Sequence, residues 1–140
     1  MVMTTPLKDP ADYQPLAAFR YGLRKFLRFS KELLRREGKL TPEQYEALLA
    51  LKAFSGNTGL SMTQLSERLQ VKHHTAVSLT DKLVTRRLVT RKRQSDDRRK
   101  VYVALTSSGT ALLTRLAALH RAHLRTLAAE LISALRALER

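Results

Sequence analysis

The chain has 140 residues and no cysteine, and its 26 Lys and Arg residues against 12 Asp and Glu residues give a formal net charge of +14. The length suits a single domain, and the lack of cysteine excludes disulfides, thiol-based redox sensing and cysteine-containing zinc sites. So large a positive charge points to nucleic acid as the partner, with an anionic membrane surface as the main alternative. No apolar run approaches the roughly 18 residues that span a bilayer, and the N-terminus lacks the hydrophobic core of a signal peptide, so we expect a cytoplasmic protein.

The N-terminal part predicts an extended arm followed by a long helix. Three of the four prolines lie in residues 1–15, and we expect the chain to enter the helix near Asp12. From Leu16 to Arg36 apolar residues recur at intervals of three and four, which is one stripe of an amphipathic helix, and basic residues occupy the other side. Gly38 is expected to end this helix as its C′ residue.

Two later segments carry the same signature of a helix start. Residues 41–44 and 61–64 each place Thr or Ser at the N-cap position and Gln three residues later, which is a capping box. The first of these helices is expected to stop before the turn residues 55–59, and the second is short and ends near Leu69.

A further helix is expected from about His73 to Arg86, after a break at residues 70–72 that lacks the glycine usual in such turns. One face of this helix is apolar and the other is polar. The polar face holds His74, Thr75, Ser78 and Lys82. Two short helices joined by a tight turn, the second with a polar side, indicate a helix-turn-helix.

Residues 88–106 predict a β-hairpin, because two runs of alternating residues flank the polar turn 94–97. Between Arg86 and Lys100 the sequence has eight basic residues and two acidic ones. A hairpin of this kind is often only a solvated basic turn, but a helix-turn-helix directly followed by one indicates a winged helix. We therefore predict a mainly α (α+β) protein, a winged helix-turn-helix with long helices at both ends.

The last helix is expected to span residues 107–140, with Thr106 as its N-cap. At about 1.5 Å per residue, its roughly 30 helical residues measure about 45 Å. Apolar residues occur on more than one of its sides, as on the first helix, and a small domain cannot cover both. We infer that the two terminal helices pack against a second copy of the chain.

Three segments resemble the MarR family of bacterial winged-helix transcription regulators. They are the wing, with residues 97–99, 103–106 and Gly109; the run from residues 81–84 through 88–91; and the helix start at residues 73–77. The resemblance implies a single MarR-type domain over residues 1–140. In it, residues 1–37 and 107–140 serve dimerisation, and residues 41–106, with the wing at 88–106, bind DNA. The sequence departs from the family pattern at Arg87, where the family usually has glycine. A residue other than glycine is costly there if its φ is positive.

The resemblance also implies that the protein is a sequence-specific DNA-binding regulator. It would act as a homodimeric repressor of a pseudo-palindromic operator, and a small aromatic or phenolic effector would release it from the DNA. Recognition helices would enter successive major grooves, and wings the flanking minor grooves. Aromatic residues of the first helices, which more often form simple core, are candidates to line an effector pocket. These are Phe19, Tyr21, Phe26, Tyr45 and Phe54. The alternative is a non-specific basic protein that coats nucleic acid or an anionic membrane surface.

The site candidates follow from this reading. In the family's pattern Arg99, with Arg98 as its neighbouring alternative, enters the minor groove, and Asp97 braces that arginine. The DNA-binding candidates are Ser61, Thr63, Gln64, His73, His74, Thr75, Ser78, Lys82, Arg86, Arg91, Arg93, Arg98 and Arg99. The residues at 61–64 are expected to hold phosphate and those at 74–82 to meet bases, although contact with water or the DNA backbone alone is equally common for any one of them.

Enzymatic readings find no support, because the sequence has no cysteine nucleophile, no glycine-rich phosphate loop, no HExxH and no GxSxG motif. We therefore predict no catalytic residue and no cofactor. His120 and His123 are three apart on the last helix, a spacing that suits two metal ligands, but no further ligands are evident. A place at a helix or dimer interface is the more frequent role of such a pair, which is also capable of sensing pH, so we predict no metal.

Overall fold

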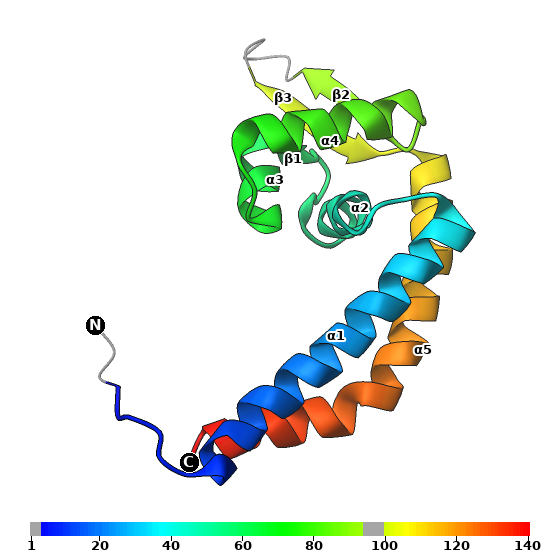
Figure 1. Ribbon diagram of the computed structural model, residues 1–140. Coiled ribbons are helices and arrows are strands. Elements are labelled where there is room, and N and C mark those ends of the chain that lie inside the picture. The colour runs from blue at the N-terminus through cyan, green and yellow to red at the C-terminus, as the bar shows by residue number, and fades with distance from the viewer. Residues whose placement is uncertain (1–3, 94–99) are drawn as a thin grey trace. The chain divides into compact units, whose positions relative to one another are not determined.

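The structure, a computed structural model, describes residues 4–93 and 100–140 (Figure 1). The described elements are α1 (Pro10–Gly38), α2 (Pro42–Phe54), β1 (Leu60–Ser61), α3 (Met62–Leu69), α4 (His73–Thr85), β2 (Val89–Arg93), β3 (Val101–Leu105) and α5 (Ser107–Leu138). They form two compact units: a helical unit of residues Met1–Glu32 and Leu119–Arg140, and a winged unit of residues Leu33–Ala118. The predicted class, mainly helical with a small antiparallel sheet, is confirmed.

The winged unit contains the helix-turn-helix and the hairpin, with α3 and α4 beside the strands (Figure 1). Its sheet has the strand order β1-β3-β2, and both pairings are antiparallel. β2 and β3 lie on either side of the predicted turn, within the range 88–106 expected for the hairpin. The two-residue β1 has no sequence pattern of its own and was not predicted. Fully buried leucines from α2, α3 and α4 fill the core, together with Val103 from β3.

The expected capping box fixes the start of α2. The backbone N–H of Gln44 donates to Oγ1 of Thr41 (3.2 Å), and the backbone N–H of Thr41 donates to Oε1 of Gln44 (3.0 Å). Each bond satisfies a backbone donor that a helix start otherwise leaves without a partner.

The end of α1 differs from the prediction by one residue. The left-handed residue after the helix is Lys39, with φ of 50°, and Gly38 is the last helical residue. The backbone N–H of Leu40 donates to the carbonyl of Leu34 (3.2 Å), so the chain that leaves the helix is bonded back to its last turns. Glycine suits position 38 for another reason: a Cβ there would lie 3.1 Å from Cδ1 of Leu116.

Several contacts join α1 and α5 within the helical unit, among them those of Gly22 and Lys25. Gly22 lies against Leu131, whose Cδ2 would be 2.7 Å from an added Cβ, so glycine permits the close approach of the helices. Nζ of Lys25 lies 2.7 Å from a carboxylate oxygen of Glu130, and this hydrogen bond raises the pKa of Lys25 above its usual value. Among the described residues, no helix combines the length and apolar character needed to cross a bilayer.

Candidate nucleic-acid interface

The polar face of α4 is presented to solvent. His74, Ser78 and Lys82, which are four residues apart, are exposed, and Thr75 beside them is half-buried. The opposite face, with Ala76, Thr80 and Leu83, is buried in the core. The polar residues that the sequence assigns to DNA contact therefore form one accessible stripe along the helix.

The turn before α4 positions that helix without a glycine. Gln70 takes the left-handed conformation, with φ of 55°, and its backbone N–H donates to the carbonyl of Glu67 (3.1 Å). Lys72, the N-cap of α4, makes no side-chain cap hydrogen bond. An N-terminus left open in this way offers backbone N–H groups to an anion such as a phosphate.

A surface pocket of about 390 Å³ brings together four of the predicted DNA-binding residues from separate elements. Ser61 and Thr63 come from the start of α3, His73 from the start of α4, and Arg91 from β2. The starts of both helices thus meet the wing at one surface of the winged unit.

The helix start at Ser61 uses some of the same groups for its own fold. Its Oγ accepts a hydrogen bond from the backbone N–H of Gln64 (3.1 Å), and Oε1 of Gln64 accepts one from the backbone N–H of Ser61 (2.9 Å). These two side chains therefore order the first turn of α3, and exposed Thr63 lies between them in the sequence.

Arg91 pairs with Asp81 of α4 through its guanidinium. The ion pair joins β2 to the exposed side of α4. The sequence reading did not identify Asp81 as a partner of Arg91. The sequence does give one indication of this pair, because Asp81 is an isolated carboxylate on a helix face that is otherwise neutral or basic.

Arg86 has partners that the sequence reading did not foresee. It is the C-cap of α4, and its guanidinium donates to two carbonyls at the end of α1, those of Lys39 (2.8 Å) and Gly38 (2.9 Å). Arg115 of α5 donates to the next carbonyl along, that of Glu37 (2.8 Å). Two arginines distant in sequence thus cap the carbonyl end of α1, where positive charge is favourable.

The described part of the wing also presents basic side chains to solvent. Lys92, Arg93 and Lys100 are exposed in or beside the two wing strands. The predicted wing-tip residues Asp97, Arg98 and Arg99 lie outside the described residues, and their roles stay predictions.

The histidines of α5 belong to the helical unit. Nε2 of His120 lies 2.8 Å from Oγ of Ser30, and both residues are buried. The ring of His123 stacks on Phe29, with the centroids 3.6 Å apart. Ser30 and Phe29 both belong to α1, so the pair lies where α1 and α5 meet. The described residues contain no group of three or more potential metal ligands.

The aromatic residues proposed for an effector pocket have separate surroundings. Tyr45 is buried in the core of the winged unit, Phe26 packs against the two histidines, and Phe54 lies under the guanidinium of Arg68. Tyr45 and Phe26 therefore make packing contacts, whereas Phe54 is 52% exposed.

Comparison with known proteins agrees with this geometry. Residues 39–100 match the sequence profile of the MarR family, and a comparison with curated proteins finds no match. AbsC, a MarR family transcriptional regulator from Streptomyces coelicolor, is 21% identical, with a TM-score of 0.75 over 88% of this chain and 82% of that one. MepR, a transcription regulator of the Staphylococcus aureus multidrug efflux pump MepA, is 23% identical, with a TM-score of 0.72 over 85% of this chain and 82% of that one.

A probable transcriptional regulator from Pseudomonas aeruginosa is 26% identical, with a TM-score of 0.66 over 85% of this chain and 92% of that one. MarR proteins are transcription regulators, which confirms the expectation that this chain is not an enzyme. The matching segment contains the helix-turn-helix and the first wing strand, and the shared fold extends to the terminal helices. Residues 39–100 therefore match the MarR family, and most of the chain shares the winged-helix fold of solved MarR-family regulators.

Proposed function

We propose that the protein is a sequence-specific repressor that binds a pseudo-palindromic operator as a homodimer and is released by a small-molecule effector. The observation that carries the proposal is the common surface formed by the open N-terminus of α4, its exposed polar stripe and the basic strand β2. A major groove admits an α-helix, and the first residues of a recognition helix reach the base edges. A structure of the similar protein MepR is a complex with DNA.

Within this surface we assign two kinds of contact. His74, Thr75 and Ser78 lie on the stripe that would face base edges, and Lys82 meets a phosphate or a guanine. His73 and Thr63 line the pocket at the two helix starts and suit phosphate contacts. Arg93 approaches the DNA backbone from the wing, and Arg98 and Arg99 reach the minor groove.

The second copy is proposed to bind through the terminal helices. In the helical unit, large apolar side chains of α5 remain exposed, among them Leu124, Ile132, Leu135 and Leu138. Leu16 of α1 is exposed as well. Apolar surface on this scale is typical of an interaction site.

The test is fluorescence anisotropy with DNA from upstream of the protein's own gene and a scrambled duplex of the same length and composition, over a salt series. A repressor of this kind should prefer its operator by about 10³-fold or more. His74→Ala should remove part of that preference, costing about 1–3 kcal/mol on the operator and less on the scrambled duplex. Ser107→Ala, an exposed change at the start of α5, is the control and should leave both affinities unchanged.

Equal affinity for both duplexes, with a steep loss in salt, would instead support the alternative of a non-specific basic protein. Its supporting observation is the net charge of +14. The operator could also lie at another locus, and a panel of genomic fragments tests this case. A specific regulator would retain one fragment at high salt, whereas a non-specific protein would retain none.

A further inference from the structure

A pocket of about 530 Å³ lies in the winged unit between the end of α4 and the strand β2, and the contacts assigned so far do not use it. The residues that line it are Val84, Arg87, Val89, Thr90, Arg91 and Thr106. The two valines supply apolar surface, and the polar groups are two hydroxyls and two guanidinium groups. Among the described residues that line this pocket, none has a carboxylate, so it suits an anion.

Three arginines lie near this pocket, and two of them have partners inside the protein. The guanidinium of Arg86 donates to two carbonyls at the end of α1, and that of Arg91 pairs with Asp81. The guanidinium of Arg87 makes no hydrogen bond or ion pair within residues 4–93 and 100–140. Because Arg87 is also exposed, its guanidinium is accessible to an anion from outside the chain.

Hydrogen bonds on both sides hold the backbone of Arg87 in place. Its N–H donates to the carbonyl of Val84 (2.9 Å), and its own carbonyl accepts a hydrogen bond from Oγ1 of Thr106 (2.7 Å). Its φ of 59° is a conformation that glycine adopts at a lower cost than arginine. Strained residues of this kind concentrate at functional sites. The strain, together with a guanidinium that has no partner in the described part of the chain, points to a partner outside it.

Arg91 connects this pocket to the surface proposed for DNA, because it also lines the pocket at the starts of α3 and α4. Both pockets therefore lie along the seam where β2 runs beside α4 (Figure 1). The 13 residues of α4 measure about 20 Å, whereas a major groove is about 12 Å wide. A helix of this length that crosses the groove brings both of its ends close to the phosphates at the edges of the groove.

A phosphate at this end of α4 requires a cation. The end of a helix carries partial negative charge on its free carbonyls, which repel an anion. The guanidinium of Arg86 is directed to α1, so Arg87 is the residue placed to supply the positive charge. A guanidinium can donate two parallel hydrogen bonds to a phosphate. Glycine would relax the backbone but would leave the phosphate beside the helix carbonyls without a cation.

We propose that Arg87 binds a phosphate of the DNA backbone, at the end of α4 opposite to the helix starts. The contact adds affinity for DNA of any sequence and fixes the position of α4 in the groove, and it does not read bases. This inference rests on the proposed function, because it takes α4 as the recognition helix. Arg87 therefore lowers the stability of the fold and raises its affinity for DNA.

Fluorescence anisotropy with the full chain tests the contact, on the upstream duplex and on the scrambled duplex, over a salt series. Arg87→Gln removes the charge and should weaken binding to both duplexes about tenfold. It should also reduce the slope of log K against log salt by about one for each copy bound. Arg87→Lys retains the charge and should retain the slope, with a smaller loss of affinity because the bidentate geometry is lost.

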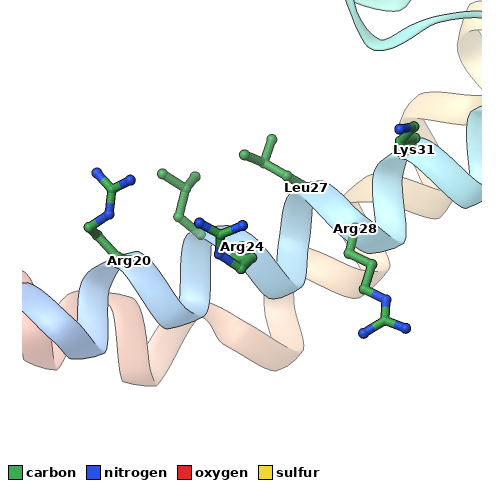
Figure 2. A pocket seen from close by; sticks show the side chains of 6 residues that line it. Arg20, Arg24, Leu27, Arg28 and Lys31 are labelled. Atoms are coloured by element: carbon green, nitrogen blue, oxygen red, sulfur yellow. The ribbon is translucent and has the colours of Figure 1, made fainter.

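Arg87→Gly separates a lost contact from a damaged fold. It should weaken DNA binding as much as Arg87→Gln, and yet raise the urea midpoint because it relieves the positive φ. A damaged fold would lower both quantities. The matched control is Arg28→Gln, which removes an exposed cation that lines a separate pocket on α1 of the helical unit (Figure 2). This control should change both affinities less than about twofold.

Three results would overturn the proposal. The first is that Arg87→Gln has the affinities and the salt slope of Arg28→Gln. The second is a loss confined to the upstream duplex, which would indicate a base contact. The third is dissociation of the dimer by Arg87→Gln in sedimentation without DNA, which would assign the guanidinium to a carboxylate of the second copy.

The scrambled duplex distinguishes failure of this inference from failure of the proposed function. If the wild-type protein binds both duplexes alike, the proposal of a sequence-specific repressor fails. A lower slope for Arg87→Gln on the scrambled duplex would still support the phosphate contact, because that contact is independent of sequence.

Discussion

Gly109 lies where the first turn of α5 passes the carbonyl of Leu88. A Cβ at this position would lie well inside van der Waals contact with that carbonyl oxygen. Oγ1 of Thr106 fixes the same junction, because it donates to the carbonyl of Arg87 (2.7 Å) and accepts from the backbone N–H of Gly109 (2.9 Å). The end of the recognition-helix segment, the end of the wing and the start of α5 therefore meet at one point.

Gly109→Ala is expected to destabilise the protein by about 2 kcal/mol or more, although alanine is the better helix former. The added methyl group must displace backbone, which cannot rotate away as a side chain can. Urea unfolding measures the change. Ser108→Ala, at the exposed neighbouring position, should stay within about 0.5 kcal/mol of wild type. Similar midpoints for the two variants would contradict the argument.

At Arg87, in contrast to Gly109, a residue other than glycine occupies a backbone conformation that favours glycine. Its φ is 59°, so the positive φ considered from the sequence is confirmed, and an arginine occupies a conformation that favours glycine. Arg87→Gly should therefore raise stability, by about 0.5–1 kcal/mol. Lys92→Gly, in an extended strand, should lower it. A fall in the urea midpoint of both variants would show that the side chain of Arg87 matters more than its backbone.

At the scale of elements, Arg86 and Arg115 tie α4 and α5 to the carbonyl end of α1. We expect Arg86→Ala to lower stability by about 1–3 kcal/mol, because two carbonyls lose a charged donor. Lys82→Ala should leave stability unchanged, weaken DNA binding and reduce the slope of log K against log salt by about one. If Arg86→Ala changed the salt slope and not the urea midpoint, Arg86 would be a DNA contact, as the sequence first suggested.

The elements themselves could be read from the sequence because their signals are local. A capping box, a run of alternating residues or a stripe of leucines fixes a helix or strand within a few residues, as in α2 and β2. The partners of Arg86 and Arg91 could not be read in the same way. Gly38 and Lys39 are more than forty residues from Arg86 in the sequence, and only the folded chain shows that its guanidinium donates to their carbonyls.

At the scale of the whole molecule, the exposed apolar surface of α5 requires an explanation. Ile132 and Leu135 are each 47% exposed. A dimer would cover these side chains. A dimer would also place one copy on each half-site of a pseudo-palindromic operator, whereas monomers would have to bind the two half-sites independently. The combined change Ile132→Asp and Leu135→Asp should yield a monomer, because it places charges in an apolar interface. Light scattering after size exclusion measures the mass, and Leu49→Asp, at an exposed leucine of α2, should leave the dimer intact.

The salt dependence of association offers an independent test of the proposed dimer. The helical unit has ten basic residues and five acidic ones, so two such units repel each other, and screening should tighten the dimer as salt rises. DNA binding should weaken over the same range, because counterions compete with the protein for phosphate. Sedimentation and anisotropy should therefore show opposite salt dependences. If the dimer also dissociated as salt rose, ion pairs and not apolar contacts would hold the two copies together.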